Sequence, residues 1–277
     1  MSGTLYLVAT PIGNLSDISD RALKTLSEVD FIAAEDTRVT IKLLNRYGIA
    51  KPLVSYYEQN KRGSGEKIIS RLLSGESCAL VTDAGMPAIS DPGEDIVKSC
   101  IAAGICVSVI PGPCAAVSAL CMSGLTAGRF CFEGFLSTAK KSRFSHLEEL
   151  KNECRTMIFY EAPHKLIRTL TDMLSVWGDR NASISREMTK IHEETLRAPL
   201  SEMLAHFEKV PPRGEFVLVV EGAKRADSEA LSLEDGLALA EAYIKSGMSI
   251  KDAAKKCAEE TGIPKNAIYT AIIKKQG

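Results

Sequence analysis

The sequence lacks the features that mark several specialised classes of protein. Among its 277 residues there is one tryptophan, and aromatic residues make up only 6%. The formal net charge is −1. The near-zero charge excludes a bulk basic field, so binding of nucleic acid would require local patches. No apolar run reaches the ~20 residues of a membrane helix. The N-terminus carries no basic segment or cleavage site of a signal peptide, so we expect a soluble, cytoplasmic protein.

Short motifs for metals and nucleotide cofactors are also absent. The eight cysteines form no C-x-x-C pair and the four histidines no H-x-x-H spacing, so we expect no metal site. Most of these cysteines lie in apolar stretches, as small core residues of a reducing compartment do. The turn at 9–15 has Gly13 alone where a dinucleotide-binding fold has three glycines, and there is no P-loop. Nicotinamide, flavin and nucleoside-triphosphate chemistry are therefore disfavoured.

Two hydrophobic periods alternate along the first third of the chain. Strand-like runs occur at 4–10, 30–34, 79–82 and 106–110. Helical spacing occurs at 21–26, 39–47, 67–73 and 95–102. Strands that alternate with helices predict an α/β fold with a covered parallel sheet. We expect these elements to form an N-terminal α/β domain over residues 1–113.

A second set of elements follows the rigid break at Pro111–Pro113. The basic, turn-rich stretch 137–143 predicts a loop, and small residues predict a helix over 115–122. Further strands are predicted near 156–160, 182–186 and 215–220, and further helices over 164–176 and 200–207. These elements predict a C-terminal α/β domain over residues 114–223.

Residues 224–277 predict a polar linker followed by a helical extension. Ser249 with Asp252 resembles a capping box, and Pro264 fits the first position of a last helix after Gly262. Helix, tight turn and helix together resemble a helix-turn-helix. A small helical cap packed on the main body is the equal alternative. Residues 245–277 contain seven lysines and three acids, a net charge of +4.

The strongest local signal is the segment 81–93, where an apolar strand leads into an acidic, glycine- and proline-rich loop. Ligands in open α/β sheets bind at the carboxyl ends of strands, where such loops lie. Gly85 permits a backbone conformation closed to other residues, and Pro87 fixes the conformation beside it. Asp83 is placed to bind a ligand or a cation, or to cap its own loop.

Acidic and basic residues follow the second predicted strand on the same sheet edge. Glu35 and Asp36 are candidates for acid–base chemistry or for capping the next helix. Arg38, Lys42 and Arg46 are four residues apart and form one stripe of that helix. A solvated face is the simplest interpretation of the stripe. Phosphate binding is the alternative, because the stripe begins beside the candidate pocket.

These segments carry a family resemblance. A-T-P-I-G-N-L at 9–15, A-A-E-D-T-R at 33–38 and the segment 81–93 are similar to tetrapyrrole-methylase-like (class III) S-adenosylmethionine methyltransferases. More narrowly, they resemble the RsmI-type small-subunit ribosomal RNA cytidine 2′-O-methyltransferases. Further matching segments follow in family order at 111–115, 123–125, 132–136, 160–164, 186–190 and 213–216. The resemblance covers nearly all of residues 1–222.

The resemblance implies two α/β domains of the tetrapyrrole methylase type, with S-adenosyl-L-methionine in the cleft between them and a homodimer as the assembly. It places the methionine and sulfonium end near Asp83–Gly85 and the loop 111–115. The adenine is placed near Tyr160–Ala162, Met188 and Gly214. The cofactor-binding residues expected in full are Pro11, Ile12, Asp83, Gly85, Pro87, Cys114, Ala115, Tyr160, Ala162, Met188 and Gly214.

A ribose 2′-hydroxyl is a poor nucleophile at neutral pH, so a positioned general base is expected to help. The candidates are Glu35, Asp36, Glu161 and Glu187, and Glu35 or Asp36 is favoured because both follow the second strand beside Arg38. The expected partner is small-subunit ribosomal RNA within the assembled subunit. The residues expected to bind it are Arg38, Lys42, Arg46, Asn60, Lys140, Lys141 and Arg143.

The chain departs from the family pattern in two places. Tyr57 and Lys61 stand where relatives usually carry His and Glu, which removes any role of that histidine, and Ser137 replaces a proline. Two other functions remain open: methylation of a small tetrapyrrole of the precorrin type, and non-catalytic binding of nucleic acid by the terminal helices. The basic stripe and the terminal extension disfavour the first. The long α/β region and near-neutral charge disfavour the second.

Overall fold

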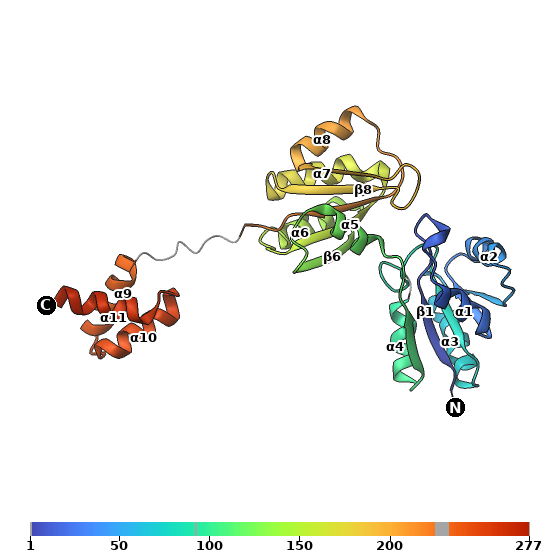
Figure 1. The fold of residues 1–277 in the computed structure, drawn as a ribbon, viewed down its shortest axis with the longest axis horizontal. Coiled ribbons are helices and arrows are strands. Elements are labelled where there is room, and N and C mark those ends of the chain that lie inside the picture. The colour runs from blue at the N-terminus through green and yellow to red at the C-terminus, as the bar shows by residue number, and fades with distance from the viewer. Residues whose placement is uncertain (1, 92, 225–232, 277) are drawn as a thin grey trace. The chain divides into compact units, whose positions relative to one another are not determined.

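The computed structural model describes residues 2–91, 93–224 and 233–276. Contacts along the chain divide it into two compact units, residues 1–223 and 224–277. The first unit contains two five-stranded sheets, each flanked by helices (Figure 1). The α/β class and the helical C-terminal segment predicted from the sequence are confirmed.

The first sheet is entirely parallel, with strand order β3-β2-β4-β1-β5. Its strands are β1 (Thr4–Val8), β2 (Phe31–Ala34), β3 (Leu53–Ser55), β4 (Cys78–Val81) and β5 (Cys106–Ile110). Its helices are α1 (Asp20–Glu28), α2 (Thr37–Arg46), α3 (Lys61–Leu73) and α4 (Glu94–Ala102), with a short 3₁₀ turn, η1, at Leu15–Asp17. Because all five strands are parallel, the loops that follow them gather at one edge of the sheet.

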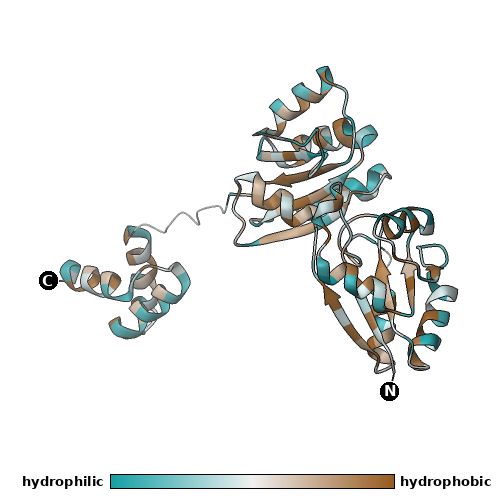
Figure 2. Cartoon of the chain, turned by 45° about the vertical axis from the view of Figure 1, so that its right-hand side comes forward, coloured by the Kyte–Doolittle hydropathy of each residue, from teal (hydrophilic) through white to brown (hydrophobic). Residues whose placement is uncertain are grey.

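Both faces of this sheet are covered, which explains the continuous apolar runs of its strands. Alternate strand residues on one face pack against α3 and α4, through Ile68 and Ile96 among others. On the other face they pack against α1 and α2, through Leu26 and Leu44. The strands accordingly form the middle of three layers. In Figure 2 they are mostly brown (hydrophobic), whereas the helices beside them carry teal (hydrophilic) residues.

The second sheet has the order β6-β7-β10-β8-β9 and is mixed, with one parallel pair, β6 and β7. Its strands are β6 (Phe130–Phe135), β7 (Thr156–Glu161), β8 (Asn181–Arg186), β9 (Glu194–Pro199) and β10 (Phe216–Val220). Its helices are α5 (Ala115–Ser123), α6 (Lys140–Glu149), α7 (Pro163–Trp177) and α8 (Leu200–Lys209). The boundary predicted between residues 113 and 114 falls between β5 and α5, and as a domain boundary it stays a prediction.

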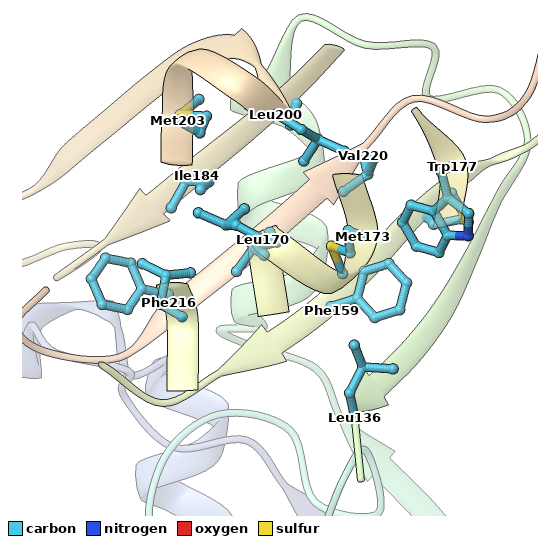
Figure 3. Packing of buried hydrophobic residues seen from close by; sticks show 14 of the residues in the cluster. Leu136, Phe159, Leu170, Met173, Trp177, Ile184, Leu200, Met203, Phe216 and Val220 are labelled. Carbon is cyan, nitrogen blue, oxygen red and sulfur yellow. The ribbon is translucent and has the colours of Figure 1, made fainter. Parts of the chain in front are cut away.

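The largest core cluster lies on the face of the second sheet that α6, α7 and α8 cover. Figure 3 shows Leu170 and Met173 of α7 packed among Phe159, Ile184 and other strand side chains. Helix α5 covers the opposite face with Ala119 and Leu120. Ile12, from the first half of the unit, also packs in that cluster. The two halves of residues 1–223 therefore share apolar contacts.

The structure corrects the sequence prediction in the middle of the chain. The stretch 137–143 was predicted as a loop, but its last four residues form the first turn of α6. Strands β3, β6 and β9 were not predicted. Most of their residues are half-buried or exposed, so their sequences show no clean alternation of buried and exposed positions. The sheet of the second half is consequently wider than its sequence pattern indicated.

The second unit consists, within its described residues, of α9 (Leu233–Lys245), α10 (Ile250–Thr261) and α11 (Lys265–Gln276). Ser249 caps α10 by accepting a hydrogen bond from the Asp252 amide at 3.2 Å. Gly262 ends α10 with a φ of +73°, in the left-handed region that favours glycine. The predicted caps Ser249 and Gly262 are therefore confirmed, whereas α11 begins at Lys265, one residue after the predicted first position, Pro264. Within the described ranges, no helix is both long and apolar enough to cross a membrane.

Candidate functional site

A cavity of about 390 Å³ opens where loops of the two sheets meet within residues 1–223. Its volume is in the range of small-molecule binding sites. The lining residues are Ile12, Glu35, Thr82, Asp83, Ala84, Gly85, Met86, Ile89, Ser90, Asp91, Cys114, Ala115, Phe135, Tyr160, Glu161, Ala162, Glu187, Met188, Lys190, Glu215, Phe216 and Val217. The first sheet contributes the loops after β1, β2, β4 and β5, as expected for the carboxyl edge of a parallel sheet.

The loop after β4 is held to the loop after β1 by backbone pairing. Thr10 N donates to Gly85 O at 2.9 Å, and Gly85 N donates to Thr10 O at 3.1 Å. The Thr10 hydroxyl also donates to Thr82 O at 3.1 Å. Gly85 has a φ of +89°, and an added Cβ would lie 3.3 Å from Ile12 Cγ2. The predicted need for glycine at this position is thus explained by both conformation and space.

Three carboxylates face the cavity from the first sheet: Glu35, Asp83 and Asp91. The Thr82 hydroxyl donates to Glu35 Oε2 at 2.6 Å, which orients that carboxylate. Burial, followed by repulsion from Glu35, raises the pKa of Asp91 to about 6 and also raises the pKa of Asp83. The cavity therefore concentrates negative charge, which favours a cationic ligand group.

The second sheet supplies an aromatic and apolar wall. The Tyr160 hydroxyl accepts a hydrogen bond from Ala116 N at 3.2 Å, which fixes the ring beside the start of α5. Burial raises the pKa of Tyr160 to about 12, so the phenol is neutral at physiological pH. Phe135 meets the Tyr160 ring edge-on at 5.5 Å between centroids, yet 56% of Phe135 is exposed. This wall offers a flat apolar surface to a ligand ring.

Backbone strain gathers around the same cavity. Four non-glycine residues in the described part of the chain have positive φ: Ala88, Ser90, Glu187 and Thr189. All four lie in the two loops that line the cavity from opposite sheets. The loop at 187–190 also contacts the first half, because a Cβ on Gly13 would lie 2.7 Å from Lys190 Cγ. Such conformations persist where the surrounding structure fixes them, and they cluster at functional sites.

Most of the residues expected to bind the cofactor line this cavity. They are Ile12, Asp83, Gly85, Cys114, Ala115, Tyr160, Ala162 and Met188. Pro11, Pro87 and Gly214 are not among the lining residues. Gly214 has a φ of +82°, and an added Cβ would lie 2.5 Å from Glu187 Oε1, so this glycine makes room for a lining side chain.

The two residues favoured as the base differ in position. Glu35 lines the cavity, whereas Asp36 does not. Asp36 caps α2 by accepting from Arg38 N at 2.8 Å, and it also pairs with the Arg38 guanidinium at 2.6 Å. The hydrogen bonds from Arg38 lower the pKa of Asp36 to about 2. A carboxylate of such low basicity is poorly matched to proton abstraction near pH 7, which disfavours Asp36.

The other acidic candidates have structural partners. Glu161 is buried and accepts hydrogen bonds from the Thr169 hydroxyl at 2.6 Å and from Ala162 N at 2.9 Å. Glu187 pairs with Lys190 at 3.1 Å.

Lys61, which stands where the family usually has glutamate, bridges Glu58 and Asp95. Among the described residues, no group of three or more His, Cys, Asp and Glu side chains could hold a metal ion.

The residues predicted to bind RNA divide into two sets. Five basic side chains are exposed: Arg38, Lys42, Arg46, Lys140 and Lys141. Asn60 is half-buried, and its amide accepts from Tyr57 N and donates to Ser55 O, which assigns it to a turn. The prediction for Arg143 is wrong. Its guanidinium is buried, donates to Asp172 Oδ2 at 2.7 Å and to the Ser137 and Thr138 carbonyls, and cannot reach a phosphate.

The buried pair between Arg143 and Asp172 gives a first testable consequence. Replacing Arg143 by glutamine should lower the melting temperature by several degrees, because an unpaired carboxylate stays buried. The same change should leave affinity for RNA unaltered, whereas the double variant Lys140→Gln/Lys141→Gln should weaken it at unchanged stability. Thermal melts and RNA titrations of both variants check this. Weaker RNA binding by Arg143→Gln at unchanged melting temperature would contradict the structural role.

Sequence reasoning did not single out several lining residues. Asp91 and Thr82 belong to the segment 81–93, but a lone pattern of Thr, Asp and Pro does not reveal which side chains face the ligand. Phe135 and Lys190 reach the cavity from elements far away in the chain. Their family motifs were recognised, and their positions in the cavity come from the structure alone.

Comparison with known proteins decides the family. The sequence profile described as Tetrapyrrole (Corrin/Porphyrin) Methylases matches residues 4–204. The chain belongs to this family. It is 51% identical over 270 residues to "Ribosomal RNA small subunit methyltransferase I" of Halalkalibacterium halodurans, covering 96% of this chain and 93% of the relative. This confirms the resemblance inferred from the ordered motifs.

A second relative and one solved structure each match about four fifths of this chain. The protein of the same name from Thermotoga maritima is 50% identical over 220 residues, which cover 79% of this chain and 99% of that protein. A uroporphyrin-III C-methyl transferase from Thermus thermophilus, solved in complex with S-adenyl homocysteine, covers 79% of this chain and 97% of its own, with a TM-score of 0.56 and 17% identity. The latter likeness shows the shared fold.

Proposed function

We propose that this chain transfers a methyl group from S-adenosyl-L-methionine to the 2′-hydroxyl of a cytidine ribose in small-subunit (16S) ribosomal RNA, in the cytoplasm. The observation that carries the proposal is identity of about half over nearly the full length with relatives named ribosomal RNA small subunit methyltransferase I. The cavity of the tetrapyrrole methylase fold supplies the site. Partners on this proposal are the RNA within the assembled subunit and a second copy of the chain.

The residues present fit S-adenosyl-L-methionine. The cavity volume suits a molecule of this size, and the carboxylates of Glu35, Asp83 and Asp91 would attract its cationic sulfonium. Asp83, Gly85, Cys114 and Ala115 would hold the methionine end, and Tyr160, Ala162 and Met188 the adenine. When bound, the cofactor would supply an activated methyl group: an oxygen that bonds to this methyl breaks its bond to sulfur, and neutral S-adenosylhomocysteine leaves.

On this proposal, Glu35 takes the ribose proton. It lines the cavity beside Asp83, and the hydrogen bond from Thr82 holds its carboxylate in one orientation. Positioning of the ribose oxygen and the methyl group also contributes to the rate, because in-line transfer depends on alignment of the reacting atoms. The strained loops at 88–90 and 187–189 fix the backbone on both sides of the cavity and so support that alignment.

RNA would reach the cavity across two exposed basic regions. Arg38, Lys42 and Arg46 lie on α2, which begins directly after Glu35 and Asp36. Lys140 and Lys141 begin α6, near the end of β6 and its cavity residue Phe135. Phosphate contacts by these side chains would position the strand, and the target nucleotide would be splayed out of its stack to enter the cavity.

Exposed apolar residues support the proposed homodimer. Val109 on the edge strand β5 and Phe130 on the edge strand β6 are 49% and 42% exposed. Val117 lies on α5, the helix that connects β5 and β6 in sequence, and it is likewise exposed. Large exposed side chains on edge strands are typical of surfaces that pair with another chain.

The raised pKa of Asp91 predicts pH-dependent selection of the charged cofactor. Between pH 5 and pH 7 Asp91 loses its proton, so affinity for cationic S-adenosylmethionine should rise relative to neutral S-adenosylhomocysteine. We expect the ratio of the two Kd values to change roughly fivefold, or about 1 kcal/mol. Calorimetry at both pH values measures it. The variant Asp91→Asn should abolish most of the change, and a ratio independent of pH in the native chain would contradict the charge argument.

The proposed substrate is tested by competition between substrate classes. Small ribosomal subunits, protein-free 16S RNA and a precorrin-type tetrapyrrole are offered separately with radiolabelled S-adenosylmethionine. We expect label in the RNA or the subunit and none in the tetrapyrrole. Transfer to the tetrapyrrole alone would replace this proposal with the small-molecule function, which the fold by itself also permits.

A further inference from the structure

The second unit leaves one helix face without an internal partner. Within the described residues of this unit, the core is formed by Ala240, Ala254, Cys257, Ile268 and Ile272. Helix α11 contributes Ile268 and Ile272 to this core, and both are nearly fully buried. The helix therefore has a fixed inner face, and the residues on its other side face solvent.

The exposed residues of α11 form a regular stripe. Asn266, Tyr269, Thr270 and Ile273 are all exposed and follow the spacing i, i+3, i+4 and i+7. Tyr269 and Ile273 are 39% and 48% exposed and lie four residues apart, so they form one exposed apolar surface on the helix. We call these four residues the outer stripe of α11. It combines an aromatic ring with amide and hydroxyl groups, as surfaces that bind nucleic acid do.

Positive charge is concentrated beside the outer stripe. Helix α11 contains Lys265, Lys274 and Lys275 and no acidic residue. Lys275 pairs with Glu241 at 2.7 Å, whereas among the described residues neither Lys265 nor Lys274 has an ion-pair partner. Helices α9 and α10 carry acids among their lysines, for example Glu259, which lies 4.0 Å from Lys255. The excess positive charge of the unit thus belongs to α11.

One relative has about the length of the first unit alone. The relative from Thermotoga maritima is matched over 99% of its length by 220 residues, the size of the unit 1–223. A protein named ribosomal RNA small subunit methyltransferase I therefore exists without a counterpart of about one fifth of this chain. The second unit fits a role in substrate binding, and the cavity already holds every residue assigned to catalysis.

We propose that the outer stripe of α11, with Lys265 and Lys274, is a second binding site for ribosomal RNA. The lysines bind phosphates, and Tyr269 stacks on an unpaired base. The inference rests on the proposed function for the identity of the RNA. Duplex DNA and a ribosomal protein are less well matched, because the substrate that the first unit must hold is itself RNA and the stripe is flanked by unpaired positive charge.

The test compares full-length variants in their binding to protein-free 16S RNA and to intact small subunits. Lys265→Gln/Lys274→Gln should weaken RNA binding and make the slope of log Kd against log salt shallower by roughly 1.4–1.8, the value for two phosphates. Tyr269→Ala should weaken binding about fivefold or more through lost stacking, and Tyr269→Phe should restore it. Lys245→Gln/Lys255→Gln removes the same charge from α9 and α10 and is the matched control.

Each result decides the proposal. Unchanged affinity and salt slope in the stripe variants, or equal weakening in the control, would overturn it. Weaker binding to intact subunits with unchanged binding to protein-free RNA would assign the stripe to a ribosomal protein and would also overturn it. Affinity for S-adenosylmethionine should be native in every variant. Failure of the native chain to methylate RNA would contradict the proposed function, while loss of RNA binding in the stripe variants would still support this site.

Discussion

Replacement of Glu35 by glutamine should lower kcat for methyl transfer by roughly 10²–10⁴-fold, the range for loss of a general base. Glutamine keeps the shape of the side chain and its hydrogen bond with the Thr82 hydroxyl, but it cannot accept a proton from a ribose hydroxyl. Binding of S-adenosylmethionine and RNA should change little. Single-turnover rates with saturating RNA and cofactor isolate the chemical step from binding.

Asp36→Asn is the matched control for this prediction. It changes an adjacent carboxylate in the same way, but Asp36 caps α2 and pairs with Arg38 outside the cavity lining. Its kcat should stay within a few-fold of the native value. A near-native kcat for Glu35→Gln would leave alignment alone as the source of catalysis, and a large loss in Asp36→Asn alone would move the base to that residue.

Gly85→Val should raise the Kd for S-adenosylmethionine at least tenfold, about 1.4 kcal/mol. The position has a φ of +89°, where a β-branched residue is strained, and its Cβ would lie 3.3 Å from Ile12 Cγ2 and 3.7 Å from Pro113 O. The loop after β4 would then separate from the loops after β1 and β5. Calorimetry with the cofactor measures the loss.

A second glycine distinguishes loss of the site from general backbone strain. Gly104 has a φ of +68° in the turn after α4, and a Cβ there would meet no atom within 4 Å. Gly104→Val should cost stability through the same conformational strain and leave the Kd for the cofactor at its native value. Equal binding loss in both variants would show that the effect at Gly85 comes from destabilisation and not from the cavity.

The sequence was sufficient for those parts of the fold in which local pattern and tertiary context agree. Strands β2 and β4 are buried along their whole length, and β1 and β5 contribute apolar residues to the same core, so each appears as an apolar run next to a helix with clear spacing. Strand β9 could not be predicted in this way, because it is an edge strand with half-buried residues and depends on its pairing with β8. Edge strands derive their structure from a partner that no local window contains.

The positions of side chains at the cavity were predictable only where the backbone fixes them. Gly85 was identified because only glycine adopts its conformation freely, and Asp83 and Glu35 because they follow strands of one parallel sheet. Arg143 was misassigned because its neighbours in sequence are exposed lysines, whereas its partner Asp172 lies 29 residues away. The raised pKa of Asp91 likewise depends on burial and on Glu35, and neither is visible in a linear pattern.

The most direct test of the account is to map ribose methylation in small-subunit ribosomal RNA. Cells that lack the modification are supplied with either the native chain or the Glu35→Gln variant, and 2′-O-methyl groups are located by mass spectrometry of RNA fragments. The account predicts that the native chain restores a methyl group on a cytidine ribose and that the variant restores little or none. Absence of any new ribose methyl group with the native chain, or a new methyl group on a base instead, would contradict it.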